Sequence, residues 1–330
     1  MIVNKDVRIS LIRMISTVMV VVLHIFQQLE NTFGNLHYFT DWLNLGLVMF
    51  FCISGFLYSN REIKEIYKWL KHRYYEISLP AVVVSILTII VFTFIGDISL
   101  KKVLAAIFSG LGGEAFLKDS WMFIQLWFLT YILVFYFTLP LIQKINCKCK
   151  SDVKFWIFFI IFLGLGQILF LTIDIPLSFG VLIRAYIPYF LFKRYNIDSN
   201  KTTKIMICLS MLSVIAIIIT IFVRYIYIIG SLSEIIFIYT QTLSGCVLFF
   251  WLYRFFDKVK NYNTLLKISD RYSYNIYLTH CLFIGYNTSL IKICDNIFVG
   301  IILALVLTGI SSVAVRYIVI GLKKIKRIGN

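Results

Sequence analysis

The sequence predicts an all-α membrane protein, a bundle of about ten transmembrane helices with the N-terminus and the C-terminus in the cytoplasm. Hydrophobic residues occupy 60% of the 330 positions, the mean hydropathy is +0.87, and only 15% of the residues are charged. Soluble domains are roughly 45–50% apolar, so this composition excludes an ordinary soluble protein. The apolar residues also fall in blocks of about 17–25, long enough to cross a hydrocarbon core as helices.

The apolar blocks give the expected spans. They lie at about 9–30, 40–59, 77–95, 121–143, 155–173, 177–192, 205–223, 234–253, 270–290 and 297–320. The chain has only four prolines, and no polar linker separates the blocks. The sequence therefore predicts one continuous bundle, a single domain over residues 1–330.

The basic residues indicate the orientation of the bundle. The formal net charge of +16 is concentrated in short segments between apolar blocks, as on the cytoplasmic side of inner-membrane proteins. Segments on the side of the two termini hold 25 of the 32 Lys and Arg residues. The opposite segments hold Lys101, Lys102, Lys118, Arg224 and Lys292, and Arg184 and Arg316 lie within spans. This bias predicts a multi-pass protein of the cytoplasmic membrane, in contact with membrane lipid and not with nucleic acid.

The N-terminus and the cysteines indicate no further processing or metal chemistry. No small-x-small cleavage site follows the first apolar block, so we expect no removable signal peptide. Cys147 and Cys149 form a CxC pair without a second pair at zinc-ligand spacing, so no metal site is predicted. The cysteines inside apolar blocks are interpreted as small apolar fillers. They are Cys52, Cys208, Cys246 and Cys281.

Two connecting segments are expected to be more than simple loops. Residues 60–76 place Trp69 and Tyr74 among basic residues, which is typical of an amphipathic helix at the cytoplasmic interface. Pro80 is then expected to open the third span. Residues 96–120, on the outer side, are too long for a tight connection, and we expect them to cap a cavity or bind a partner.

Ionisable groups at membrane depth are costly, so they are the first functional candidates. Arg13 and His24 are 11 residues apart in the first span, which is roughly 16 Å of rise and three turns plus about 20°. They therefore project from nearly the same face, Arg13 on the cytoplasmic side. A cationic anchor and a titratable base suit a long anionic molecule threaded through the bundle. Considered without His24, Arg13 would be interpreted as an ordinary cytoplasmic anchor of the helix. Considered without Arg13, His24 would be interpreted as a polar contact between helices.

Further polar candidates lie in the second and third spans. Ser54 and Gly55 would let a backbone or a ligand approach closely, although small residues in spans usually pack helices. Lys71 and Arg73 would hold phosphates at the interface, and anionic lipid head groups are the alternative ligand.

The later spans also carry polar side chains. Trp127 begins the fourth span, and Arg184 lies in an otherwise apolar stretch of the sixth. In the ninth span, Ser273, Tyr277 and His280 follow the spacing i, i+4, i+7. Such a stripe faces protein or water, not lipid.

In combination these segments resemble the acyltransferase family 3 membrane proteins, which include bacterial O-acetyltransferases acting on surface polysaccharides. The motifs are the R-x10-H spacing of Arg13 and His24, the stretch Phe50–Leu57, the basic run before Pro80, Leu126–Leu129, and Ser273–His280. Their order and the ten-span layout agree with the family over nearly the whole chain.

The resemblance implies a cytoplasmic acyl-CoA donor, usually acetyl-CoA, and an acceptor reached from the other face. Arg13, Lys71 and Arg73 would hold the phosphates. His24 and Arg13 are the predicted catalytic pair, with His24 as a general base or as an acyl carrier. The chain departs from many relatives by reading Lys71-His72-Arg73 in place of consecutive arginines. We expect no fused hydrolase-like or racemase domain. The remaining candidates are assigned to substrate binding. They are Ser54, Trp127, Arg184, Tyr277 and His280.

The favoured function is therefore a membrane-bound O-acetyltransferase that modifies a cell-surface polysaccharide, such as a capsule or exopolysaccharide, or its lipid-linked precursor. A transporter or flippase is the alternative, but the two halves of the chain show no internal repeat. An idle sensor with the same fold is a third alternative. The acceptor sugar and the oligomeric state stay open, a homo-oligomer included.

Overall fold

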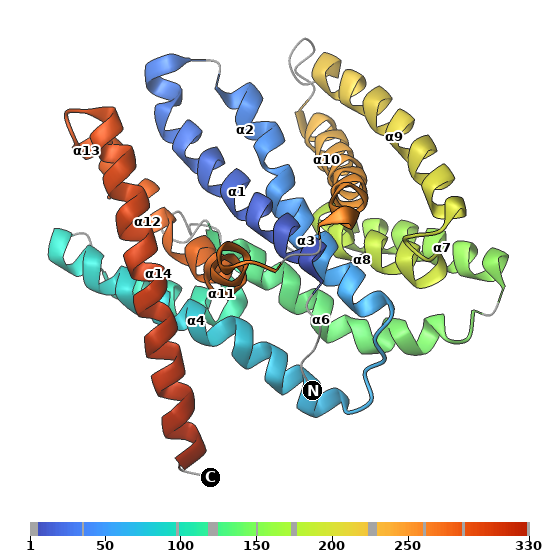
Figure 1. Cartoon of the computed structure of the whole chain (residues 1–330), viewed down its shortest axis with the longest axis horizontal. Coiled ribbons are helices and arrows are strands. Elements are labelled where there is room, and N and C mark those ends of the chain that lie inside the picture. Colours follow the sequence, from blue (N-terminus) through green and yellow to red (C-terminus); the bar gives the residue numbers. More distant parts are fainter. Residues whose placement is uncertain are drawn as a thin grey trace. The chain divides into compact units, whose positions relative to one another are not determined.

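Every regular element in the part of the chain that the structure describes is helical, which confirms the all-α prediction. This computed structural model describes residues 6–34, 36–96, 99–117, 125–149, 151–172, 177–223, 230–259, 262–285 and 288–328. The chain divides into two compact units, each with its own hydrophobic core. Helices α1, α6 and α11 each contribute residues to both units. Figure 1 labels the helices of the chain.

The first unit is built around a trio of packed helices. It comprises Met1–Met19, Asn44–Lys64 and Thr138–Ser269. Its elements are the start of α1 (Val7–Phe33), α3 (Leu45–Ser59), the end of α6 (Trp127–Asn146), α7 (Asp152–Thr172), α8 (Phe179–Arg194), α9 (Asn200–Ile221), α10 (Gly230–Phe255), η5 (Phe256–Lys258) and the start of α11 (Thr264–Thr279). Helix α3 packs against α8 and α10, and α10 packs against α9. Ile12, Met49 and Phe249 are fully buried in its core.

A glycine explains how closely α3 and α8 approach. A Cβ atom on Gly55 would lie 2.0 Å from the backbone oxygen of Ala185 in α8, so no larger side chain fits. The neighbouring Ser54 hydroxyl donates to the backbone oxygen of Phe50, 3.2 Å away in the same helix. Ser54 and Gly55 were expected to let either a backbone or a ligand approach closely. The structure shows a close approach of the α8 backbone.

The second unit has α4 and α14 as its longest helices. It comprises Val20–Leu43, Glu65–Phe137 and Asp270–Asn330. Its elements are the rest of α1, α2 (His37–Leu43), α4 (Ile66–Ile95), α5 (Leu100–Phe108), η1 (Ser109–Gly113), η2 (Glu114–Phe116), the start of α6, the end of α11, α12 (Cys281–Ile284), α13 (Leu290–Ile293) and α14 (Ile297–Ile328). Helix α14 contacts α4, α12 and α13. Val21, Ile25 and Ile284 belong to its core.

The expected boundary at Pro80 is wrong. Residues 66–76 of the predicted interfacial helix and the predicted third span form one helix, α4, with Pro80 in its interior. Its 30 residues correspond to about 45 Å. An interior proline removes a backbone hydrogen bond and costs about 3 kcal/mol. Because Pro80 and its neighbours Ser78 and Ala81 are buried against the rest of the unit, packing outweighs that cost.

The segment expected to be a long outer loop is largely helical. Ser99 caps α5 by accepting a hydrogen bond from the backbone N–H of Lys102, and η1 and η2 follow directly. The segment packs back on α4, where a Cβ atom on Gly110 would lie 2.7 Å from the Ser85 hydroxyl oxygen. Residues 97, 98 and 118–120 of this segment lie outside the described residues. Its expected partner role stays a prediction.

Eight helices in the described ranges are long and apolar enough to cross a membrane. They span Val7–Glu30, Phe39–Ser59, Ile66–Ile95, Trp127–Asn146, Asp152–Leu169, Asn200–Ile221, Ser233–Lys258 and Ile297–Ile325. The other two expected spans are shorter in the structure. Residues 177–192 correspond to α8, which has 16 residues and is almost entirely buried. Residues 270–290 correspond to α11 followed by the four-residue α12.

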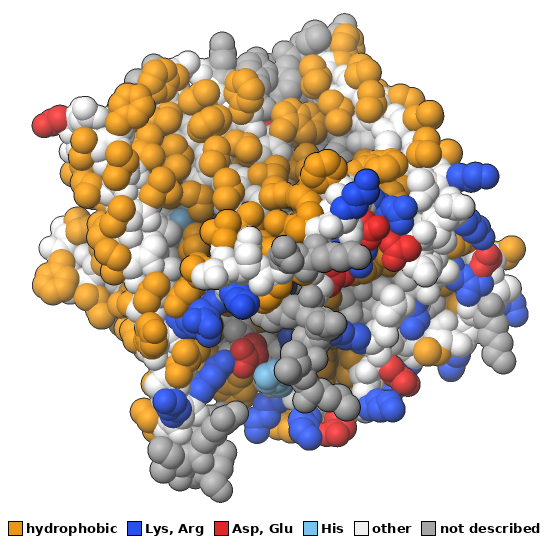
Figure 2. Space-filling model, viewed as in Figure 1, with side chains coloured by type: hydrophobic (Ala, Val, Ile, Leu, Met, Phe, Trp, Pro, Cys, Tyr) orange, Lys and Arg blue, Asp and Glu red, His pale blue; other side chains and the backbone are white. Residues whose placement is uncertain are grey.

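Several of these helices expose large apolar side chains. Ile160 on α7, Met211 on α9 and Ile302 on α14 are 65%, 64% and 61% exposed. Figure 2 shows hydrophobic side chains over a large part of the face that it draws. Water-soluble monomers rarely expose apolar surface on this scale, whereas lipid accommodates it. The chain is a multi-pass membrane protein.

Candidate active site

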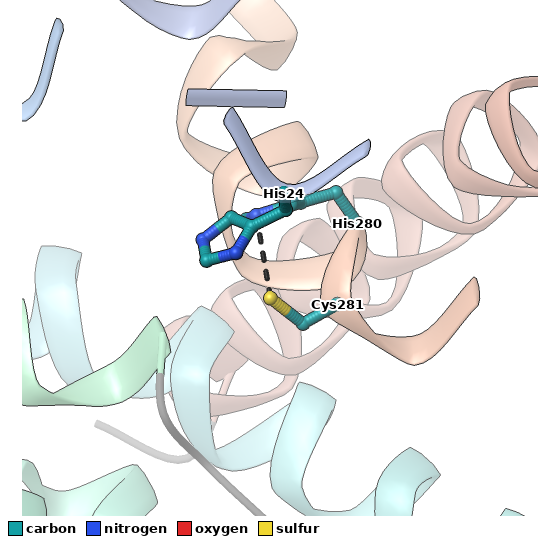
Figure 3. Close-up of side chains that lie close together, drawn as sticks. All are labelled: His24, His280 and Cys281. Atoms are coloured by element: carbon teal, nitrogen blue, oxygen red, sulfur yellow. Dashed lines mark hydrogen bonds between the residues drawn. The ribbon is translucent and has the colours of Figure 1, made fainter. Parts of the chain in front are cut away.

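Two histidines from distant parts of the chain meet in the second unit. His24 projects from α1, and His280 lies at the junction of α11 and α12. Their ring centroids are 4.9 Å apart and the rings are tilted by 41° (Figure 3). His280 is fully buried and His24 is half-buried. The structure thus brings together the predicted base and a predicted substrate-binding residue.

Hydrogen bonds determine the tautomers of both rings. The Nδ1 atom of His24 lies 2.7 Å from the side-chain oxygen of Gln27, one turn further along α1. His280 Nδ1 lies 2.7 Å from the backbone oxygen of Tyr277. Amide and carbonyl oxygens only accept hydrogen bonds, so Nδ1 is the donor in each neutral ring. Each Nε2 atom is therefore left with a lone pair that can accept a proton or bind a metal ion.

A thiol completes the cluster. Cys281 Sγ lies 3.3 Å from His280 Nε2, which accepts the S–H hydrogen bond (Figure 3). The ligand atoms of His24, His280 and Cys281 all lie within 4.8 Å of one another. The sequence suggested only an apolar filler at Cys281. In the sequence, only the position of Cys281 next to His280 could have indicated a role in a site. The spacing of residues along the chain does not show that α1 brings His24 close to Cys281.

Tyr277 links this cluster to the start of α6. Its hydroxyl donates to the backbone oxygen of Gln125 at 2.5 Å, and its ring packs against Phe128 with centroids 5.4 Å apart. Trp127, at the first position of α6, packs edge-on against Tyr131. Tyr277 therefore fixes the end of α11, and with it His280, against the segment that carries Trp127.

A buried acid also faces this region, and the sequence did not single it out as a site residue. Glu114 in η2 is only 4% exposed and interacts electrostatically with Tyr277. A carboxyl group buried in this way is rare without a structural or functional role. Residues 96–120 were expected to form an outer connection and not helices packed on the rest of the unit. The sequence therefore did not show that Glu114 would be buried.

The predicted phosphate clamp lies on α4 of the same unit. Lys71 is exposed and Arg73 is half-buried. The helix is held near them by the Tyr74 hydroxyl, which donates to the backbone oxygen of Leu111 at 3.2 Å, and by an ion pair of Glu76 with Lys323 at 2.5 Å. An exposed lysine beside a fixed helix segment leaves a cationic side chain able to meet an anionic ligand.

The remaining predicted residues lie in the first unit. Arg13 is half-buried on the first part of α1, and Ser54 bonds within α3. Arg184 is 2% exposed, and its Nη2 atom donates to the side-chain oxygen of Gln241 at 3.1 Å. That oxygen also accepts a hydrogen bond from Asn44 Nδ2 at 3.2 Å, so Arg184 takes part in a buried polar network of its unit.

Comparison with known proteins decides the family. The sequence matches the acyltransferase domain over residues 6–320, nearly the whole chain. The chain belongs to acyltransferase family 3. It is therefore a membrane acyltransferase, as the resemblance of its motifs indicated. No curated protein and no solved structure matched the chain.

Proposed function

We propose that this acyltransferase moves an acetyl group from cytoplasmic acetyl-CoA to a hydroxyl group of a surface polysaccharide or its lipid-linked precursor, with His24 as the general base. The observation that carries the proposal is the hydrogen bond between His24 Nδ1 and the Gln27 side-chain oxygen, which leaves Nε2 unprotonated in the neutral ring. A base of this kind needs a lone pair at a defined position.

The chemistry of the proposed step is a direct transfer. His24 Nε2 takes the proton of the acceptor hydroxyl while that oxygen attacks the thioester carbonyl carbon. The carbon–sulfur bond breaks, and the coenzyme A thiolate takes up the proton that His24 held. The products are an O-acetyl ester and free coenzyme A. His280, Tyr277 and Trp127 would line the acceptor side of this reaction.

Donor binding is proposed for the cationic side chains. Lys71 and Arg73 on α4 would hold the phosphates of coenzyme A, with Arg13 as a further contact near the cytoplasmic end of α1. The exposure of Lys71 supports this role, since a compact ammonium group at an interface meets phosphate without prior desolvation. Ser54 and Arg184 are the less direct candidates for substrate contact, because both make hydrogen bonds within their own unit.

The proposal is tested by acetyl transfer with the purified full chain in lipid vesicles. The vesicles receive acetyl-CoA with a labelled acetyl group, together with glycan extracted from cells that make this protein. The amount of labelled acetyl ester on the glycan is then measured. We expect transfer by the wild type, and for Arg73→Ala a raised KM for acetyl-CoA with little change in kcat. Glycan movement across vesicles without any loss of acetyl-CoA would contradict the proposal and favour a flippase.

A further inference from the structure

We propose that His24, His280 and Cys281 form a binding site for a soft divalent cation of the Zn²⁺ type, and that the bound cation blocks acyl transfer. The binding site stands on geometry alone, whereas the block rests on the proposed function of His24. The three side chains offer two imidazole nitrogens and one cysteine sulfur, a ligand set that zinc favours. The Cys281 thiol would lose its proton to the solvent when the cation binds.

The spacing of the ligand atoms suits one ion. In a tetrahedral zinc site, bonds of about 2.3 Å to sulfur and about 2.0 Å to nitrogen place the two atoms roughly 3.6 Å apart. Cys281 Sγ and His280 Nε2 are 3.3 Å apart, within a few tenths of an ångström of that separation. One ring nitrogen from each histidine and the Cys281 sulfur all lie within 4.8 Å of one another, so side-chain shifts of roughly 1 Å, with a turn of the His24 ring, close the site.

The hydrogen bonds behind the ligands are those that metal sites use. Metal-binding histidines usually donate their second ring N–H to a carbonyl or carboxylate oxygen, which orients the ring. His280 Nδ1 is bonded in this way to the backbone oxygen of Tyr277, and His24 Nδ1 to the side-chain oxygen of Gln27. Both Nε2 atoms are therefore in the tautomer that a cation requires before any cation arrives.

Metal binding and base catalysis compete for one atom. His24 Nε2 can hold a proton or a metal ion, but not both at once. Three protein ligands also leave the fourth position of a tetrahedral ion open, as in sites where the ion exchanges or meets small ligands. We therefore expect the cation to bind reversibly and to inhibit transfer.

The direct test uses Co²⁺ as a spectroscopic probe on the full chain, purified in detergent and stripped with a chelator. A sulfur–cobalt charge-transfer band that saturates at one ion per chain, and that Zn²⁺ abolishes, is the expected result. Cys281→Ser should lose this band. The matched control is Cys246→Ser, since Cys246 is a buried thiol 3.5 Å from the thiol of Cys52 in the other unit, and it should keep the band.

Two further variants examine the arrangement. His280→Ala should weaken Co²⁺ binding by removing a ligand, and Gln27→Ala should weaken it roughly 10- to 100-fold by releasing the His24 ring. Transfer rates are then measured with and without Zn²⁺, each normalised to the metal-free rate of the same variant. We expect Cys281→Ser to be less sensitive to Zn²⁺ than Cys246→Ser.

The outcomes separate the two proposals. A charge-transfer band that depends on Cys281 supports the site even in a protein that transfers no acetyl group. Absence of the band in folded wild type, or a band equally strong in Cys281→Ser, overturns the site whatever the transfer activity. Equal inhibition by Zn²⁺ of Cys281→Ser and Cys246→Ser would overturn the proposal that a cation bound at this site inhibits transfer.

Discussion

Gln27 decides which nitrogen of His24 can accept a proton. Its side-chain oxygen holds the Nδ1 proton at 2.7 Å, so the lone pair of the neutral ring is at Nε2. His24 is a candidate from the sequence alone, because an ionisable group inside an apolar block is conspicuous. Gln27 and Cys281 are not, because an amide and a thiol carry no charge and their place beside His24 depends on how α1 meets the end of α11.

The positioning role of Gln27 predicts a selective loss of rate. Gln27→Ala should lower kcat by up to about 10-fold, the worth of one hydrogen bond, with little change in the KM for acetyl-CoA. Gln27→Glu keeps an oxygen acceptor and should restore most of the rate. Gln28→Ala, at the adjacent position of α1, is the matched control and should behave as wild type. A loss confined to KM would show that Gln27 binds the donor instead.

The carboxyl group of Asp6 should make the stability of the folded protein depend on pH. Burial raises the pKa of its carboxyl group, but hydrogen bonds from Arg8 and Tyr253 outweigh burial and lower that pKa overall. A lowered pKa stabilises the folded state above the unfolded value of about 3.9, and this contribution is lost as the pH falls through the folded value. Asp6→Asn should therefore lower the unfolding temperature at pH 7, and less so near pH 3. A difference that is the same at both pH values would contradict this account.

The local pattern of apolar residues predicted the helices well and the ends of the helices less well. Apolar blocks of span length became α1, α4 and α14, because the hydrophobic content of a long helix is a local property. Pro80 was expected to begin a helix, but it lies inside α4 because burial of its surroundings stabilises the continuous helix. The segment 96–120 was expected to be a connection on the outer side, but it is largely helical, and Gly110 allows it to pack closely on α4.

The close contact of α3 with α8 makes the packing of these helices sensitive to any side chain added at Gly55. Gly55→Ala places a methyl group 2.0 Å from the backbone oxygen of Ala185, so the helices must separate, at a cost of roughly 1–3 kcal/mol or more. We expect a lower unfolding temperature and a smaller monodisperse fraction in detergent. Gly164→Ala on α7 is the control from the same unit, because a Cβ atom there meets nothing within 4 Å. Equal stability of the two variants would show that α3 and α8 are not packed this closely.

At the scale of the whole molecule, the distribution of basic residues predicts the orientation in the membrane. Two native cysteines test it. Cys147, after α6, is exposed and is predicted to be cytoplasmic, whereas Cys294, between α13 and α14, is half-buried and is predicted to lie outside. Two variants are made, each with all cysteines replaced except Cys147 or Cys294. A maleimide that cannot cross the membrane, added to intact cells, should label the variant with Cys294 and not the variant with Cys147. Labelling of Cys147 alone would reverse the topology.

Replacement of His24 by alanine removes the proposed base of this membrane acyltransferase. The measurement is acetyl transfer together with acetyl-CoA binding by calorimetry on the purified variant. We predict a fall in kcat of about 10²- to 10⁴-fold, the usual contribution of a general base, with acetyl-CoA binding close to that of the wild type. Transfer at the wild-type rate in a folded His24→Ala protein would show that His24 is not the base.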